Sequence, residues 1–227
     1  SRFAGKCINK VSRETTVSGS LKTGLMEIFT YQTIAASVQA EFKDKGSSFT
    51  AYAYPVRTES EVKEYVDKLK QEHHKARHHC YAYRISVDGN RFRANDDGEP
   101  AGSAGRPILG QIDSFGLTDV LVVVVRYFGG TLLGVPGLIR AYKSSTEMAL
   151  REAQIIEKNI EKTVLLRCEY PHLSQMLIIG RQHQAQVLEQ DLQLDCQITF
   201  SIPLSSYRHC LDAWMGTRQA EIIEQAA

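Results

Sequence analysis

The sequence Val-Leu-Val-Val-Val-Val at residues 120–125 restricts the fold more than any other feature of the chain. The run is too short for an independent helix, and as an extended chain it is apolar on both faces. A strand of this kind must be covered on both sides, as the central strand of a layered domain is. We therefore expect residues 120–125 to form a buried central strand that carries Arg126 at its end.

Periodic apolar patterns around this run predict the rest of an amino-terminal α+β domain. Residues 34–42 alternate between apolar and polar and predict one strand, with residues 48–56 as its hairpin partner. Thr58 followed by Glu61 is a capping-box pattern and predicts a helix that continues to about Gln71. Further elements are expected as strands at 80–87 and 91–94 and as helices at 106–112 and 136–151.

The residues from Glu161 onward predict a second domain. Their patterns run strand, helix, strand, strand, helix, strand, which is the ferredoxin-like βαββαβ order. A polar stretch without periodicity at 155–160 separates the two parts, so we expect domains at residues 26–156 and 160–227. Residues 1–25 are rich in Lys and Arg and are interpreted as an extension, native or artificial, with a basic RNA-binding arm as the alternative.

Composition excludes several classes of protein. The formal net charge of +1 gives no overall attraction to nucleic acid, so any such contact must use a local patch. The five cysteines are widely spread without CxxC spacing, which argues against a disulfide framework and a zinc site. No apolar run approaches the roughly 18 residues of a membrane span. We expect a cytoplasmic protein with reduced thiols, without a membrane segment, metal or cofactor.

Residues 96–107 concentrate the candidate chemistry of the chain. Glycines and a helix start there predict an anion cradle that involves Gly98, Gly102, Ser103, Gly105 and Arg106. The carboxylates Asp97 and Glu99 are instead candidates for a Mg²⁺ ligand or a general base. The structural alternative is a tight connection in which polar side chains cap the helix and glycines supply positive φ. The segment has neither the Walker nor the dinucleotide fingerprint.

Residues 73–80 hold four histidines and Cys80, which raises the question of a metal site or a Cys–His nucleophile. In a strand, His78 and His79 point to opposite faces, so at most one of them shares a site with the neighbours of Cys80. His79 is therefore a catalytic candidate. The alternative is a buried structural cysteine beside a hydrogen-bonded histidine.

Residues 68–93 carry seven Lys or Arg against two carboxylates, with aromatic residues interleaved. Cationic side chains attract phosphates and aromatic rings stack on unpaired bases. This pattern predicts RNA contacts through Lys75, Arg77, Arg84, Arg91 and Arg93, and its alternative is a solvated helix end with ordinary strand aromatics. For Arg126 we keep two interpretations, a clamp on a carboxylate of residues 96–99 or an anion ligand.

Three motifs together resemble the YigZ/IMPACT family of the bacterial two-domain type. They are His78-His79-Cys80, Asp96-Asp97-Gly98-Glu99-Pro100-Ala101-Gly102 and Arg126-Tyr127-Phe128-Gly129-Gly130-Thr131-Leu132-Leu133-Gly134. The resemblance covers roughly residues 30–150, and residues 160–227 resemble the carboxy-terminal domain of the bacterial members. It implies a first domain similar to the second domain of small-subunit ribosomal protein five. It also implies a second domain similar to domain V of elongation factor G.

The resemblance implies a role near translation without a defined reaction. Eukaryotic members are similar in the first domain and modulate translational control by binding a co-activator of a stress kinase, but they carry a different additional domain. We therefore expect a regulatory or binding protein that contacts RNA, the ribosome or a translation factor. The alternative is an enzyme that acts on a phosphorylated small molecule or nucleotide through residues 96–107 and Arg126. The sequence leaves the oligomeric state open.

Overall fold

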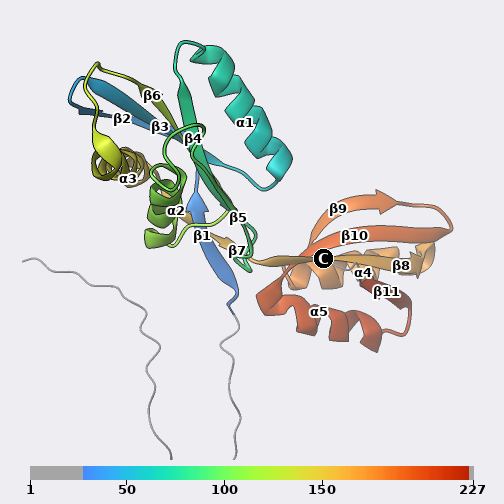
Figure 1. Cartoon of the computed structure of the whole chain (residues 1–227). Helices are drawn as coiled ribbons and strands as arrows, with labels where there is room; N and C mark the ends of the chain where they lie inside the picture. Colours follow the sequence, from blue (N-terminus) through green and yellow to red (C-terminus); the bar gives the residue numbers. More distant parts are fainter. Residues whose placement is uncertain (1–27, 225–227) are drawn as a thin grey trace, which may run out of the picture.

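The structure is a computed structural model of the 227-residue chain and describes residues 28–224. It is a mixed α/β protein with two sheets, each with its own hydrophobic core, joined by a two-stranded ribbon (Figure 1). The extension predicted for residues 1–25 lies outside the described residues. Among the described helices, none is both long and apolar enough to cross a membrane.

The first sheet has five antiparallel strands with the predicted apolar run at its centre. The strand order is β2 (Val38–Asp44), β3 (Ser47–Pro55), β6 (Val120–Tyr127), β4 (His78–Ile85) and β5 (Arg91–Asn95). Every residue of β6 except the last, Tyr127, is buried. The prediction of a central buried strand is confirmed, because β6 is hydrogen-bonded on one side to β3 and on the other to β4.

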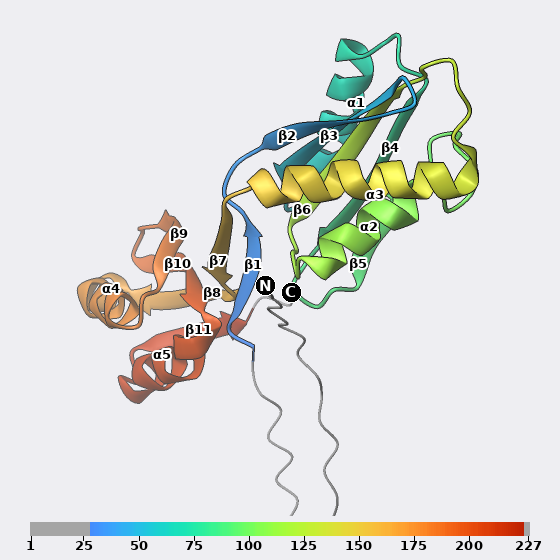
Figure 2. The ribbon, with the colours of Figure 1, turned by 90° about the vertical axis from the view of Figure 1, so that its left-hand side faces the viewer.

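Helices cover both faces of this sheet, as Figure 2 shows. The side chains of β6 alternate, so Val122 and Val124 pack under α2 (Gly105–Ser114) and α3 (Gly134–Glu152). Leu121 and Val123 face α1 (Glu59–Glu72) on the other side. Burying an aliphatic side chain of this size stabilises the fold by roughly 1.5–3 kcal/mol.

The start of α1 shows the capping box that the sequence predicted. The Thr58 hydroxyl oxygen accepts a hydrogen bond from the Glu61 amide at 3.2 Å. The Glu61 carboxylate accepts one from the Thr58 amide at 3.0 Å. Two of the unpaired backbone donors at the start of the helix are thereby satisfied, which fixes where the helix begins.

The ribbon between the domains corrects two sequence predictions. Residues 34–42 do not form one strand, because β1 (Thr30–Ile34) ends at a bend and β2 begins at Val38. The polar stretch expected as the domain boundary contains β7 (Ile155–Asn159), a strand that was not predicted and that pairs antiparallel with β1. β7 alternates between exposed and half-buried side chains and has no buried residue, so it lacks the apolar alternation that identifies a strand in sequence.

The second sheet has the predicted βαββαβ order. Its elements are β8 (Glu161–Glu169), α4 (Leu173–Gln182), β9 (Gln186–Asp191), β10 (Asp195–Pro203), α5 (Leu204–Gly216) and β11 (Ala220–Glu224), with a short 3₁₀ turn at Tyr170–His172 before α4. The strand order is β11-β8-β10-β9, and both helices pack on one face around Trp214 and Phe200. The domain limits and the likeness to the two named translation domains stay predictions.

Candidate functional site

A buried ion pair lies where β6 ends. Arg126 Nη1 donates a hydrogen bond to Glu99 Oε1 at 2.5 Å, and the two side chains are 7% and 4% exposed. The Tyr142 hydroxyl, on α3, donates to the same oxygen at 2.8 Å. The Arg126 guanidinium also lies 5.4 Å from the Phe49 ring centre and 5.7 Å from that of Phe128. The structure shows Arg126 paired with Glu99 as a clamp, and anion binding by Arg126 stays a prediction.

The amino terminus of α2 is occupied by a carboxylate of the protein itself. Asp96 accepts hydrogen bonds from the amides of Gly102 at 2.8 Å, Ala104 at 3.0 Å and Gly105 at 2.8 Å. Burial raises the pKa of the Asp96 carboxyl, whereas the hydrogen bonds from the three amides together lower it by more. The pKa therefore lies below its ordinary value. The Ser103 hydroxyl donates to Pro100 O at 2.6 Å. The amides expected to cradle an anion therefore already bind one, and ligand binding by this loop stays a prediction.

Asp97 joins this loop to β4 and α1. Its carboxylate accepts the His79 amide at 2.7 Å and lies 3.7 Å from Lys70 Nζ. Burial lowers the pKa of the His79 imidazole, although the nearby Asp97 raises it. His79 Nδ1 is 3.8 Å from Asp97, whereas His78 Nδ1 bonds to the Asp97 carbonyl oxygen at 2.9 Å. The catalytic candidates Asp97 and His79 are thus neighbours, and Glu99 belongs to the separate pair with Arg126.

Cys80 is a buried residue with structural contacts. Its thiol donates toward the Asp96 carbonyl oxygen at 3.0 Å and lies 3.3 Å from the Tyr142 hydroxyl. Burial strongly raises the pKa of this thiol, which disfavours the nucleophilic thiolate. Within residues 28–224, no three His, Cys, Asp or Glu side chains are arranged to hold a metal ion.

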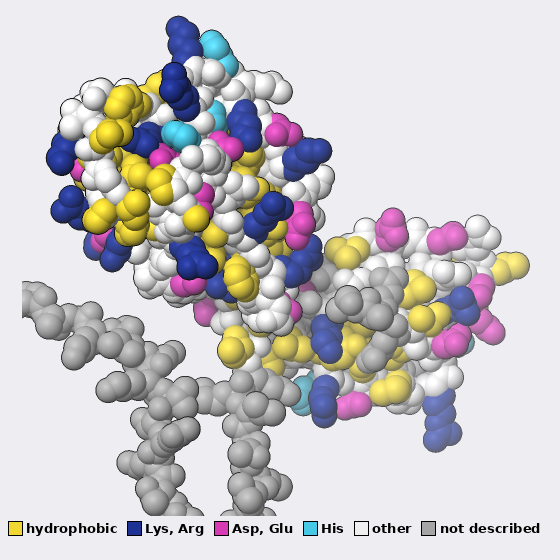
Figure 3. Space-filling model, in the orientation of Figure 1, with side chains coloured by type: hydrophobic (Ala, Val, Ile, Leu, Met, Phe, Trp, Pro, Cys, Tyr) yellow, Lys and Arg dark blue, Asp and Glu magenta, His cyan; other side chains and the backbone are white. Residues whose placement is uncertain are grey.

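An open hollow of about 620 Å³ adjoins the ion pair, and we call it the basic hollow. Its lining consists of Lys75, Arg77, His78, Arg126, Tyr127, Phe128 and Leu132. None of the described residues that line it is a carboxylate, and Phe128 is 55% and Leu132 83% exposed. Figure 3 shows Lys, Arg and His side chains beside hydrophobic ones at the upper end of this domain, where α1 ends and β4 begins. This mixture of cations and apolar surface suits a nucleic acid.

The five arginines and lysines predicted to bind nucleic acid do not share one surface. Lys75 and Arg77 line the basic hollow. Arg84 instead pairs with Asp113 of α2 at 2.7 Å, and Arg91 lies 3.8 Å from Glu59. Arg93 lines a separate hollow beneath α1. The pairing of strands therefore disperses a stretch that is continuous in sequence.

Sequence reasoning missed the apolar members of the basic hollow. Tyr127 and Phe128 follow Arg126 directly and Leu132 comes after the two glycines, in a segment interpreted as a strand end and a glycine break. The available signal was the aromatic pair itself, since two aromatic residues directly before Gly129 and Gly130 lie where the strand ends. Their exposure shows that they belong to the surface and not to the core.

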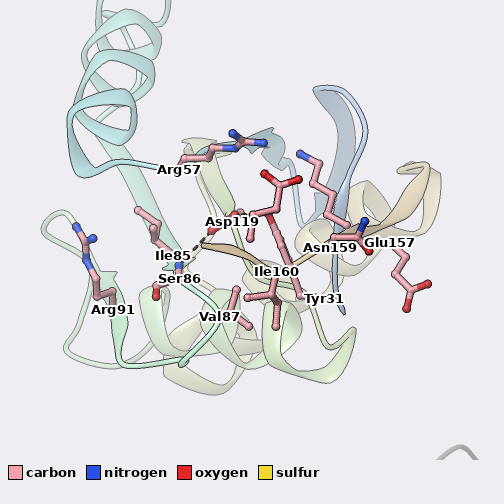
Figure 4. Close-up of a pocket in the computed structure, with 12 residues that line it drawn as sticks. Tyr31, Arg57, Ile85, Ser86, Val87, Arg91, Asp119, Glu157, Asn159 and Ile160 are labelled. Atoms are coloured by element: carbon pink, nitrogen blue, oxygen red, sulfur yellow. Dashed lines mark hydrogen bonds between the residues drawn. The ribbon is translucent and has the colours of Figure 1, made fainter. Parts of the chain in front are cut away.

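A second hollow, of about 550 Å³, lies at the joint between the ribbon and the first sheet (Figure 4). Asp119 accepts hydrogen bonds there from the Tyr31 hydroxyl at 2.8 Å and the Ser86 amide at 3.1 Å. Burial and the bond to Asp119 raise the pKa of Tyr31 to about 12. Arg57, Arg91 and Lys158 share the lining with three carboxylates, those of Asp119, Glu157 and Glu161. Because these charges balance, this joint is less suited to a phosphate backbone than the basic hollow is.

Comparison with known proteins places the chain among close relatives. The family model of the Impact N-terminal domain matches residues 45–150. IMPACT family member YvyE of Bacillus subtilis is 36% identical over 149 residues, which are 66% of this chain and 69% of that protein. An IMPACT family member of Haemophilus influenzae is 35% identical over 170 residues, 74% of this chain and 82% of that protein. A crystal structure of a hypothetical protein superposes with a TM-score of 0.72 at 28% identity, covering 88% of this chain and 99% of the other.

Proposed function

Because the chain belongs to the IMPACT family, we propose that it is a cytoplasmic, translation-associated binding protein that contacts RNA through the basic hollow. The translational setting follows from what the family resemblance implies. The observation that carries the RNA contact is a hollow lined by Lys75, Arg77 and the exposed Phe128, with no carboxylate among the described residues of its lining. Cations bind phosphates and aromatic rings bind bases, so one site offers both contacts.

The charge of the basic hollow comes from two side chains. Arg126 is balanced by Glu99, so it adds little net charge to the surface. Lys75 and Arg77 are exposed, and in the part of the chain that the structure describes neither makes an ion pair. Their charges are therefore available to a polyanion, whose condensed counterions are released when the phosphates are neutralised.

The ion pair gives the basic hollow its shape. Arg126 is held by Glu99 and places its guanidinium beside the Phe128 ring. A cation over an aromatic face contributes about 0.5–2 kcal/mol of stabilising free energy. Arg126 therefore stabilises the position of the Phe128 ring. In this proposal Arg126 is a positioning residue, and Lys75 and Arg77 contact the RNA.

No observation favours the enzyme alternative over RNA binding. The carboxylates of Asp96, Asp97 and Glu99 all accept hydrogen bonds from the protein itself. An enzymatic role would require these oxygens to bind a proton or a metal ion in addition to the partners that they already have. The alternative stays a prediction.

The experiment is a binding titration by fluorescence anisotropy with a labelled, unstructured RNA oligonucleotide. The test variant carries Lys75→Glu with Arg77→Glu, and the control carries Arg181→Glu with Arg208→Glu, two exposed residues of the second domain. Both variants change the net charge by the same amount. We expect the test variant to bind about tenfold more weakly and the control to bind like the wild type. Equal loss in both variants, or no binding by the wild type, would overturn the proposal.

A further inference from the structure

Phe128 is supported on one side and open on the other. The Arg126 guanidinium lies 5.7 Å from its ring centre, yet 55% of the residue is exposed. Leu132, at 83% exposure, and Tyr127, at 36%, line the same hollow. An aromatic face that is open to solvent beside cations is a platform on which a nucleobase can stack.

Gly129 fixes the backbone next to this platform. Its amide donates to Ser47 Oγ at 3.0 Å. A Cβ atom on Gly129 would lie 1.8 Å from the backbone carbonyl carbon of Gly46, so the loop crosses the turn between β2 and β3 at a distance that glycine alone permits. Phe128 is therefore placed before any ligand arrives, which reduces the entropy lost on binding.

Tyr127 is held in place by a histidine at the end of α1. Its hydroxyl is 3.0 Å from His73 Nδ1, and the opposite ring nitrogen of His73 is 2.9 Å from the Tyr52 hydroxyl. The imidazole thus connects β3 and β6 at the end of α1. Both aromatic residues of the basic hollow are held by defined contacts, which is the property of a preformed site.

The dimensions and chemistry of the basic hollow select the kind of nucleic acid. Its volume of about 620 Å³ lies within the range of small-molecule sites, about 300–1,000 Å³. A duplex keeps its bases inside the stack and offers phosphates alone, so it can reach Lys75 and Arg77 without using Phe128. A single strand can turn one base out onto the ring while its phosphates meet the two cations.

We propose that the basic hollow binds one unpaired nucleotide of single-stranded RNA, with its base on Phe128 and its flanking phosphates at Lys75 and Arg77. This inference rests on the proposed function and specifies the RNA that the site takes. Phe128 then contributes affinity by stacking, and the two cations contribute the salt-dependent part.

The test compares a labelled single-stranded RNA oligonucleotide with a blunt RNA hairpin of the same number of nucleotides, whose two arms are joined by a polyethylene glycol linker, so that the hairpin has no unpaired base and the number of phosphates is nearly the same. Phe128→Leu keeps an apolar side chain but removes the aromatic face, and Phe128→Tyr keeps the face. We expect the single strand to bind more tightly than the hairpin. Phe128→Leu should weaken single-strand binding about tenfold, Phe128→Tyr should stay within about twofold of the wild type, and hairpin binding should be unchanged in both.

The variants separate this inference from the proposed function. If charge reversal at Lys75 and Arg77 weakens binding while Phe128→Leu binds like the wild type, RNA binding stands and the stacking inference is overturned. The same holds if hairpin and single strand bind equally. If neither RNA binds, both proposals fall. Phe128→Tyr provides a second test in case Phe128→Leu does not fold. If Phe128→Tyr binds the hairpin and the single strand equally, that result alone contradicts the inference.

Discussion

Arg126 and Glu99 form a buried pair through a hydrogen bond of 2.5 Å, and Tyr142 donates to the same carboxylate oxygen. The three residues come from β6, from the loop before α2 and from α3. The ion pair and the Tyr142 hydrogen bond therefore connect the central strand of the sheet with the loop before α2 and with α3. It also ends at the basic hollow, which Arg126 lines.

Breaking this pair on one side should destabilise the first domain. Arg126→Met leaves the Glu99 carboxylate buried without its cation, and we expect a loss of about 3–5 kcal/mol in the free energy of unfolding. Urea denaturation followed by circular dichroism measures this loss. The double variant Arg126→Met with Glu99→Leu serves as the control and should recover part of it, because no buried charge remains. A loss under about 1 kcal/mol in the single variant would contradict the role of a clamp.

Removing the charge of Asp96 should weaken the start of α2. Asp96→Asn keeps one acceptor oxygen but loses the carboxylate that binds the three amides, and we expect a loss of about 1–2 kcal/mol at neutral pH. Because the folded pKa of Asp96 is lowered, its contribution is present above the unfolded value of about 3.9 and disappears as the pH falls through the folded value. The gap between wild type and variant in urea denaturation should therefore narrow in acid. If the wild type and Asp96→Asn differed in the free energy of unfolding by the same amount at neutral and at acidic pH, this account of Asp96 would be wrong.

His79 should make the protein less stable in mild acid. Burial lowers its folded pKa, so the unfolded chain binds a proton first and stability falls as the pH drops below the unfolded value of about 6.5. We expect thermal unfolding of the wild type to shift to lower temperature between pH 8 and pH 5.5. His79→Gln should reduce that shift. If the unfolding temperature shifted by the same amount in the wild type and in His79→Gln, the loss of stability in acid would come from groups other than His79.

The crossing of Gly129 over Gly46 should not tolerate a side chain. Gly129→Ala forces the two turns apart, and overpacking of this kind costs about 1–3 kcal/mol. Gly110→Ala, within α2, is the matched control, since nothing lies within 4 Å of its added Cβ. The control should gain about 0.5–1 kcal/mol because alanine favours a helix. Chemical denaturation of the two variants decides the point, and equal stabilities would contradict the close approach.

The sequence predicts elements whose signals are local. Residues 120–125 are apolar on both faces and occupy the central strand, and Thr58 with Glu61 begins α1 as its capping pattern indicates. The ribbon could not be found in this way. β7 has no covered face, so its identity as a strand depends on β1, which lies more than a hundred residues earlier in the chain.

The sequence drew attention to the charged residues of this region but not to the residues that they contact. Asp97, Glu99 and Arg126 were selected from residue type and neighbouring glycines, while their partners follow from strand order and loop path. Spacing cannot show that Asp96 occupies the helix terminus that seemed open to a ligand. Nor can it show that Arg84 and Arg93 lie apart from Lys75, since that depends on which face of β4 and β5 each one occupies.

The salt dependence of RNA binding tests the central claim most directly. Each phosphate neutralised on a single strand contributes about 0.7 to the slope of the logarithm of affinity against the logarithm of salt concentration. We therefore predict that Lys75→Ala with Arg77→Ala lowers the magnitude of the wild-type slope by about 1.4. A wild-type affinity that does not change with salt, or equal slopes for the two proteins, would contradict RNA binding at the basic hollow.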